Sequence, residues 1–193
     1  RKYPVIMPLI WCIFLINIAA HAVQTTWSYY TMEKFSWDER MVGISLGYIG
    51  ILLAIVQAGL LRIIIPKLGL AKSILLGLLF NSIALPLLGF ATTTWMLFAI
   101  SVLYVSAGIA GPALQSLVSN LTPKNEQGQI QGGIASIVSL TAIIGPPLMS
   151  NLFAYFTNKD APYYFPGAPF IMGGLLAAIA TAIALKYIRG KHG

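Results

Sequence analysis

The chain has 193 residues, of which 58% are hydrophobic and only 9% are charged, and its mean hydropathy is +0.81. Soluble domains carry about 25% charged residues, so a soluble fold is excluded because it would have no place for so much apolar surface. The net charge of +7 at pH 7 does not indicate a nucleic-acid partner, because Lys and Arg lie in short segments between apolar runs, where they set membrane orientation.

Six apolar runs are long enough, or nearly so, to cross about 30 Å of hydrocarbon as helices. None of the six contains Asp, Glu, Lys or Arg. They cover residues 6–30, 42–61, 73–91, 95–117, 130–153 and 168–185. The sequence therefore predicts an all-α integral membrane protein, with residues 1–193 forming one domain that is a six-transmembrane-helix bundle.

The segments between the runs contain signals for helix ends. Ser36 and Glu39 have the spacing of a capping box, which predicts the start of the second helix. Pro66 and Gly69 mark the loop before the third. Thr122 and Pro123 predict an N-cap and a first-turn proline for the fifth.

The basic residues predict the orientation in the membrane. With the N-terminus inside, Lys34, Arg40 and Lys159 fall outside, which leaves nine of the twelve Lys and Arg residues inside, Arg1 and Lys2 among them. The positive-inside rule then places both termini in the cytoplasm.

Catalytic and metal-binding signatures are not found. Cys12 is the single cysteine, which rules out an internal disulfide and a cysteine-rich metal site. The two histidines, His21 and His192, do not form the H-E-x-x-H pattern of zinc proteases, and no G-x-S-x-G motif occurs. We expect no enzyme activity, no metal and no cofactor.

Polar side chains inside the spans indicate where a substrate binds, because each costs free energy in lipid unless it is paired. Asn17, His21 and Gln24 are spaced four and then three residues apart, on one face of the first helix, and Trp27 extends this stripe. Further candidates for lining a cavity are Gln57, Gln115 and Ser139.

Each of these residues also has a purely structural interpretation. His21 is the one imidazole inside a span and either relays a proton or donates a hydrogen bond to a neighbouring helix. Gln57 and Gln115 either line a cavity or join helices through hydrogen bonds. Asn81 and Tyr104 are interpreted as packing residues.

Glycine and proline predict where helices approach each other or bend. Gly43–Gly47 and Gly128–Gly132 have the GxxxG spacing that lets backbones come close. Gly145, Pro146 and Pro147 predict a bend in the fifth helix, which either serves as a hinge or is a static kink.

Three strings resemble the tetracycline-resistance type of drug:proton antiporter of the major facilitator superfamily. The string from Trp27 to Trp37, with Met41 to Leu46 after it, resembles the junction of the seventh and eighth helices of these exporters. Gly108 to Gln115 resembles their tenth helix, and Glu126 to Gly132 with Gly145 and Pro146 resembles their eleventh. The resemblance covers nearly the whole chain in order.

The resemblance implies that the chain is the C-terminal half of such an exporter, helices seven to twelve, built as two three-helix inverted repeats. Gln57 falls where these exporters carry a glutamine on the eighth helix, whereas Leu53 stands where they can have a histidine. Arg62, Lys67 and Gly69 resemble a worn copy of the cytoplasmic gating loop.

The function implied is export of a drug-like small molecule in exchange for protons, across a bacterial inner membrane. The partners implied are an N-terminal six-helix half, the lipid bilayer, the drug and protons. The chain begins with Arg1 and not with Met, so we expect a fragment or a processed product. Two alternatives stay open: a superfamily importer of a metabolite, and a self-standing six-helix pore or assembly subunit.

Overall fold

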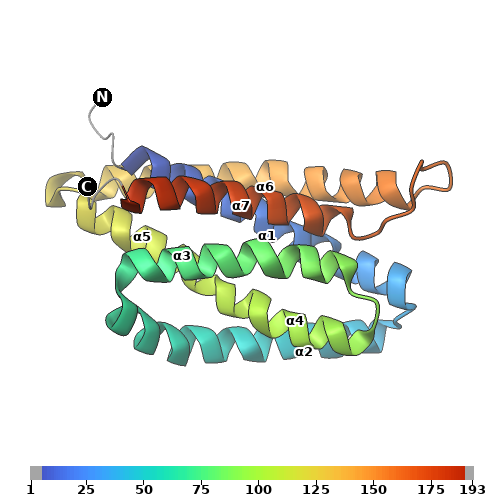
Figure 1. Ribbon diagram of the computed structural model, residues 1–193. Coiled ribbons are helices and arrows are strands. Elements are labelled where there is room, and N and C mark those ends of the chain that lie inside the picture. Colours follow the sequence, from blue (N-terminus) through green and yellow to red (C-terminus); the bar gives the residue numbers. More distant parts are fainter. Residues whose placement is uncertain (1–5, 190–193) are drawn as a thin grey trace.

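The computed structural model describes residues 6–189 and is helical almost throughout, with no strand in this part of the chain (Figure 1). Three short turns of other helix types, the π-helical η1 and the 3₁₀-helical η2 and η3, lie between longer α-helices. In chain order the elements are α1 (Ile6–Phe35), α2 (Glu39–Ile55), η1 (Val56–Leu60), α3 (Leu61–Phe90), α4 (Thr94–Ser106), η2 (Ala107–Ile109), α5 (Ala110–Leu121), η3 (Lys124–Glu126), α6 (Gln127–Thr157) and α7 (Ala168–Arg189).

Five continuous helical stretches in the described residues are long and apolar enough to cross a membrane. One of them, Glu39–Phe90, has 52 residues, which is more than twice the length that one crossing needs. Gly69 interrupts it with φ 78° and ψ 163°, a conformation that glycine adopts without steric cost. The chain reverses direction there, so that α2 and α3 are antiparallel (Figure 1). The prediction of an all-α membrane helix bundle is confirmed, and the reversal at Gly69 divides the longest of the five stretches into two arms.

The helix starts differ from two of the predicted caps. Asp38, and not Ser36, caps α2: its Oδ1 accepts a hydrogen bond from the Met41 amide at 2.8 Å. Ser36 has φ 53° and lies in the turn before the cap. Thr122 caps no helix start, because its hydroxyl donates to the Val118 carbonyl at 2.8 Å and so ends α5.

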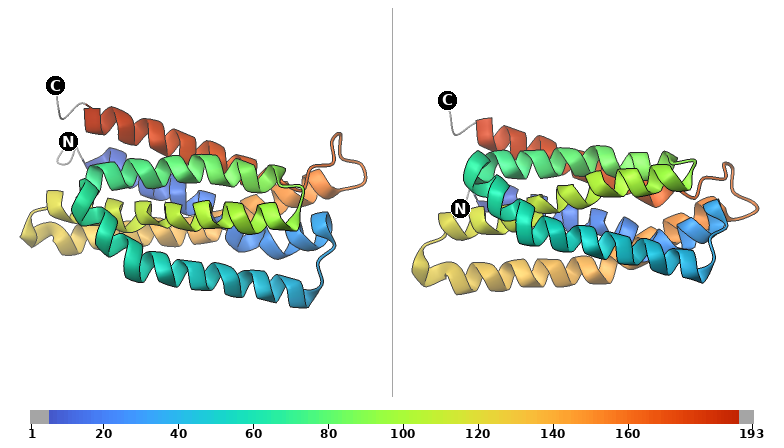
Figure 2. Two further views of the ribbon diagram at one scale, coloured as in Figure 1. Left: turned by 60° about the horizontal axis from the view of Figure 1, so that its bottom comes forward. Right: turned by 90° about the horizontal axis from the view of Figure 1, so that it is seen from below.

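The helices are arranged unequally around the bundle. Figure 2 shows α3 and α7 together on one side, with α2 and α6 toward the other. Close packing occurs at particular glycines: a Cβ on Gly77 would lie 2.7 Å from the Ala110 amide nitrogen, and one on Gly173 would lie 3.1 Å from the Ala19 carbonyl oxygen. The glycines of both predicted GxxxG pairs have no atom within 4 Å of such a position. Within the described residues, these pairs therefore do not bring helices of this chain together.

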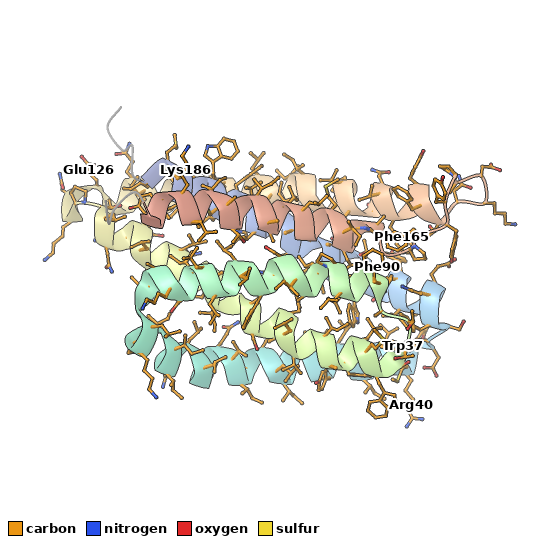
Figure 3. The ribbon with its side chains drawn as sticks, viewed as in Figure 1. Trp37, Arg40, Phe90, Glu126, Phe165 and Lys186 are labelled. Carbon is orange, nitrogen blue, oxygen red and sulfur yellow. The ribbon has the colours of Figure 1, made fainter. Side chains whose placement is uncertain are left out.

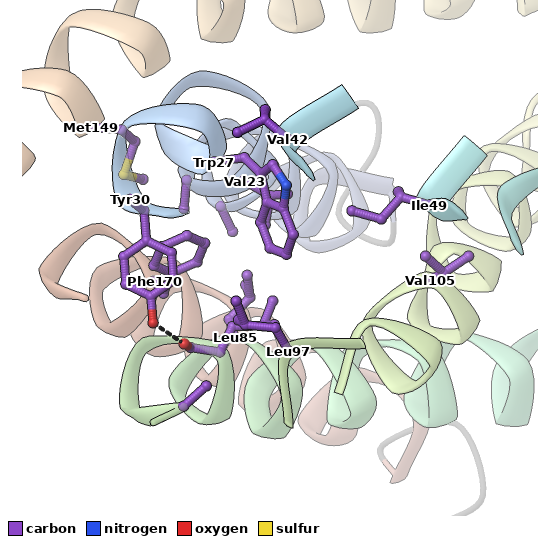
Figure 4. Packing of buried hydrophobic residues seen from close by; sticks show 14 of the residues in the cluster. Val23, Trp27, Tyr30, Val42, Ile49, Leu85, Leu97, Val105, Met149 and Phe170 are labelled. Carbon is purple, nitrogen blue, oxygen red and sulfur yellow. Dashed lines mark hydrogen bonds between the residues drawn. The ribbon is translucent and has the colours of Figure 1, made fainter. Parts of the chain in front are cut away.

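Hydrogen bonds join α1 and α3 at the end of the bundle where both helices stop. The Tyr30 hydroxyl donates to the Leu88 carbonyl at 2.5 Å, and its ring packs on Phe170 of α7 with 4.6 Å between ring centroids (Figure 4). The Lys34 ammonium donates to the Gly89 carbonyl at 2.9 Å. A cation at the C-terminal end of a helix interacts favourably with the helix dipole. This end of α1, α3 and α7 is consequently held together at several points.

The loop between α6 and α7 closes over the same end. Tyr164 donates to the Glu33 carboxylate at 2.6 Å, and the Phe165 ring lies 5.4 Å from that of Phe90. Figure 3 shows Phe90, Phe165, Trp37 and Arg40 at this end, and Glu126 and Lys186 at the opposite end. The start of α1 and the end of α7 also share that opposite end (Figure 1). Arg1, Lys2 and Lys191 lie outside the described residues, so the cytoplasmic placement of the termini stays a prediction.

Candidate functional site

A cavity of about 480 Å³ lies between α1, α2, α3 and the α4–η2–α5 segment. This volume falls within the range of about 300–1,000 Å³ that small-molecule sites occupy. Its polar lining residues are Asn17, Gln24, Trp27, Ser28, Asn81, Tyr104 and Gln115. Its apolar wall consists of Ile16, Ala20, Val23, Leu46, Ile49, Leu53, Val105, Ala107, Gly108, Ala110, Gly111 and Pro112. Of the described side chains, none that lines this cavity carries a charge.

The face of α1 that carries Asn17, Ala20, Gln24 and Trp27 forms one wall of the cavity. The Asn17 amide nitrogen donates to the Ile13 carbonyl at 2.8 Å, which leaves its oxygen available as an acceptor. The Trp27 indole donates to Ser45 Oγ on α2 at 3.0 Å, and so its ring is fixed between the two helices. Three residues of the predicted α1 stripe thus share this wall.

Asn81 and Tyr104 bring two more polar groups to the cavity, although the sequence favoured a packing role for both. Among the described residues, neither side chain has a hydrogen-bond partner, so the Asn81 amide and the Tyr104 hydroxyl are free to bind a ligand. The one available signal was that a polar residue in the middle of a span needs a partner. That signal does not say which side of α3 or α4 faces the cavity.

The fourth span bends where it meets the cavity. Between α4 and α5, residues Ala107–Ile109 form a 3₁₀ turn, and Pro112 has no amide to donate to the Gly108 carbonyl. A Cβ on Gly108 or Gly111 would meet no atom within 4 Å, so bare backbone faces the space at these positions. Gln115 follows on the same wall, which combines backbone carbonyl and side-chain amide groups.

Three predicted cavity residues do not line this cavity. His21 is turned to the neighbouring helix and packs against Gly145 of α6. Gln57 is exposed and lies within the π-helical turn η1. Ser139 is exposed on α6. A substrate-binding role for these three stays a prediction.

The hinge and gating candidates lie in two separate places. Gly145 is buried, and α6 continues as one helix through Pro146 and Pro147. Two side chains one turn later, Ser150 and Asn151, donate to the Pro146 and Pro147 carbonyls, each at 2.8 Å. Arg62, Lys67 and Gly69 are exposed at the reversal between α2 and α3, and their gating role stays a prediction.

Apolar helices of membrane length around a polar cavity are a feature that membrane transporters share. The chain belongs to the Major Facilitator Superfamily, whose model matches residues 9–192. It is therefore a multi-pass membrane protein of a transporter family. Groups of three or more His, Cys, Asp or Glu residues able to hold a metal ion are not found in residues 6–189.

Several curated relatives are tetracycline resistance proteins. The chain is 35% identical to the class E protein of Escherichia coli over 92% of its own length and 43% of the relative's. It is 35% identical to the class G protein of Vibrio anguillarum, over 88% and 42% of the two lengths. A mouse protein, hippocampus abundant transcript 1, is 27% identical over 90% and 40%. The chain thus spans about two fifths of the length of the curated relatives that it matches.

Proposed function

We propose that this chain is the C-terminal half of a drug:proton antiporter that exports a tetracycline-type molecule through the cavity described above. The observation that carries the proposal is the cavity itself, which offers amides, a phenol and an indole wall without any charge. Such a wall suits a polar molecule with a ring system, held by hydrogen bonds of roughly 1 kcal/mol each. The bacterial relatives are named tetracycline resistance proteins, which supports a drug over a metabolite as the substrate.

The partner in this proposal is an N-terminal six-helix half that covers α2 and α6. Only Val42, Ser45 and Ile49 of α2 are buried, although the helix has 17 residues. In contrast α1, of 30 residues, buries twelve of them within the bundle. Both α2 and α6 lie on the side away from α3 and α7 (Figure 2). The proposal places this apolar side against the other half, in a bacterial inner membrane with both termini cytoplasmic.

Transport by the complete gene product tests the proposal. Tetracycline should accumulate in inverted membrane vesicles when a proton gradient is imposed, and it should leak out when the gradient is collapsed. Residues 1–193 alone should give no gradient-driven flux, because alternating access needs two bundles around one site. A complete product that confers neither tetracycline resistance nor flux would refute export of this drug class. Coupled flux from residues 1–193 alone would refute the half-transporter assignment.

A further inference from the structure

His21 lies at the edge of the cavity face of α1 and contacts a different helix. His21 is four residues after Asn17 and three before Gln24. At about 100° of rotation per residue, this spacing places it beside the wall that these two residues form. Its ring packs on Gly145 of α6: a Cβ built there would lie 2.6 Å from His21 Cγ and closer still to Cδ2. The imidazole therefore occupies space that exists only because residue 145 has no side chain.

The backbone of α6 lacks hydrogen-bond donors at this same level. Pro146 and Pro147 have no amide hydrogen, so the carbonyls of Ala142 and Ile143 receive no bond from the residue four positions later. These carbonyls are within one helical turn of Gly145. A neutral imidazole has one N–H donor, whereas an imidazolium has two. Protonation of His21 thus adds a donor beside a helix that has unused acceptors.

The surroundings of His21 contain no fixed counter-charge. Within residues 6–189 the imidazole forms no hydrogen bond or ion pair. Glu33 and Lys34 are twelve and thirteen residues further along α1, which is about 18 Å or more at 1.5 Å per residue. The other titratable and charged side chains described on α1, on the helices packed against it and across the cavity are Cys12, Tyr29, Tyr30, Glu33, Lys34, Glu39, Arg40, Tyr48, Arg62, Lys67, Lys72, Tyr104, Tyr155, Lys186 and Tyr187.

We propose that His21 binds and releases the exchanged proton, and that its contact with Gly145 couples this protonation to movement of α6. This inference rests on the proton-coupled export proposed above. Uptake forms one N–H bond on the free ring nitrogen with a proton from water on one side of the membrane. Release breaks that bond and returns the proton to water on the other side. An imidazolium in a span is costly without acceptors, so movement of α6 away from α1 favours release.

A substrate-free measurement tests the inference directly. Spin labels at Met32 on α1 and Tyr155 on α6, which are both exposed, report the distance between the helices in a cysteine-free complete gene product. The distance should change with pH, with a midpoint between about 5 and 8, where histidine titrates. The change should vanish in His21→Gln and in His21→Asn, and it should persist in the matched control His192→Gln.

Filling the space beside the ring gives a second test. Gly145→Ala keeps His21 but displaces its ring, and should therefore shift the midpoint. A distance that does not depend on pH, or a transition that survives both His21 substitutions, would overturn the inference. If His21→Gln fails to fold, His21→Asn and Gly145→Ala still test whether His21 causes the pH-dependent change in distance.

Transport separates this inference from the proposed function. With tetracycline as the probe, His21→Gln should lower gradient-driven accumulation by at least about tenfold. This factor is of the size found when two coupled binding sites are uncoupled. Exchange of labelled for unlabelled tetracycline without a gradient should continue. If the unsubstituted protein does not transport tetracycline, the proposed substrate is wrong, while the pH-dependent distance still decides the role of His21. Equal loss of both activities would refute a specific proton-binding role.

Discussion

The uncharged lining of the cavity determines how single residues should affect binding. Each amide or hydroxyl contributes a hydrogen bond that replaces one to water, so its net effect is modest. Tyr104 and Asn81 are the clearest cases, because neither has a partner among the described residues. Trp27 is different: its indole is already bonded to Ser45, so it acts by shape.

We expect Tyr104→Phe to weaken drug binding by less than about tenfold, since it removes one hydroxyl and keeps the ring. The measurement is equilibrium binding of tetracycline to the purified complete protein. Tyr48→Phe is the matched control: its hydroxyl donates to the Phe98 carbonyl at 3.3 Å and is not part of the cavity wall. Unchanged affinity in Tyr104→Phe, or an equal loss in Tyr48→Phe, would contradict this role.

A second prediction concerns Tyr164 in the loop that closes the end of the bundle. Its hydrogen bond to the Glu33 carboxylate, with smaller effects from burial and from the charge of Glu33, raises the pKa of Tyr164 from 10.0 to about 12. A raised pKa means that the bond stabilises the fold fully below pH 10 and that this contribution is lost as the pH rises to about 12.

Tyr164→Phe should therefore lower the melting temperature by a constant amount up to about pH 9, and the difference should disappear by about pH 12. Thermal unfolding of the purified protein over this range is the measurement. Tyr163→Phe provides the control, because Tyr163 is 78% exposed and forms no such bond. A difference that persists at pH 12 would show that the Tyr164 hydroxyl does not act through this bond.

At the level of helices, the sequence predicted which segments are helical better than it predicted their contacts. Apolar runs without charges specify spans, since lipid leaves few alternatives. Asp38 and Ser36 are both capping residues two positions apart, and the sequence alone does not decide between them. The sequence did not show that Asn81 faces the cavity, because the side that α3 turns to the cavity depends on its contact at Gly77, and glycine spacing did not identify that contact.

The glycine contacts give a prediction at the level of helices. Gly77→Ala should destabilise the protein by about 1–3 kcal/mol, because the new Cβ would meet backbone atoms of Ala107 and Ala110 that have no freedom to move aside. Gly43→Ala, the same change on the open face of α2, should stabilise the protein by about 0.5–1 kcal/mol if nothing covers that face, because Ala favours the helix over Gly. Thermal unfolding of the complete protein compares the two.

The result for Gly43→Ala also tests the proposed partner. A loss of stability there, with no atom of this chain within 4 Å, would locate a packed partner on α2. Equal stability of Gly77→Ala and the unsubstituted protein would contradict the close contact between α3 and the 3₁₀ turn. The two substitutions together separate contacts inside the bundle from contacts with another half.

For the whole molecule, the testable feature is which end of the bundle faces the cytoplasm. Lys124 belongs to η3, which ends at Glu126, at the end shared with Lys186 (Figure 3). Lys159 lies in the loop between α6 and α7, and Phe165 of this loop is at the opposite end. In a cysteine-free background with Cys12→Ser, Lys159→Cys should react with a membrane-impermeant maleimide on intact cells and Lys124→Cys should not. Reaction of Lys124→Cys from outside, with Lys159→Cys protected, would reverse the orientation.

The reversal at Gly69 also has a consequence for biogenesis. The two arms of Glu39–Phe90 make few contacts with each other in the folded protein, because α4 passes between α2 and α3 (Figure 1). In the order of synthesis, α2 must wait in the bilayer until Thr94–Ser106 has been made before it gains its main neighbour within this chain. During that interval the open glycine face of α2, and Gln57 in the adjoining η1, must be covered by lipid, by an insertion chaperone or by the proposed N-terminal half, which is synthesised first.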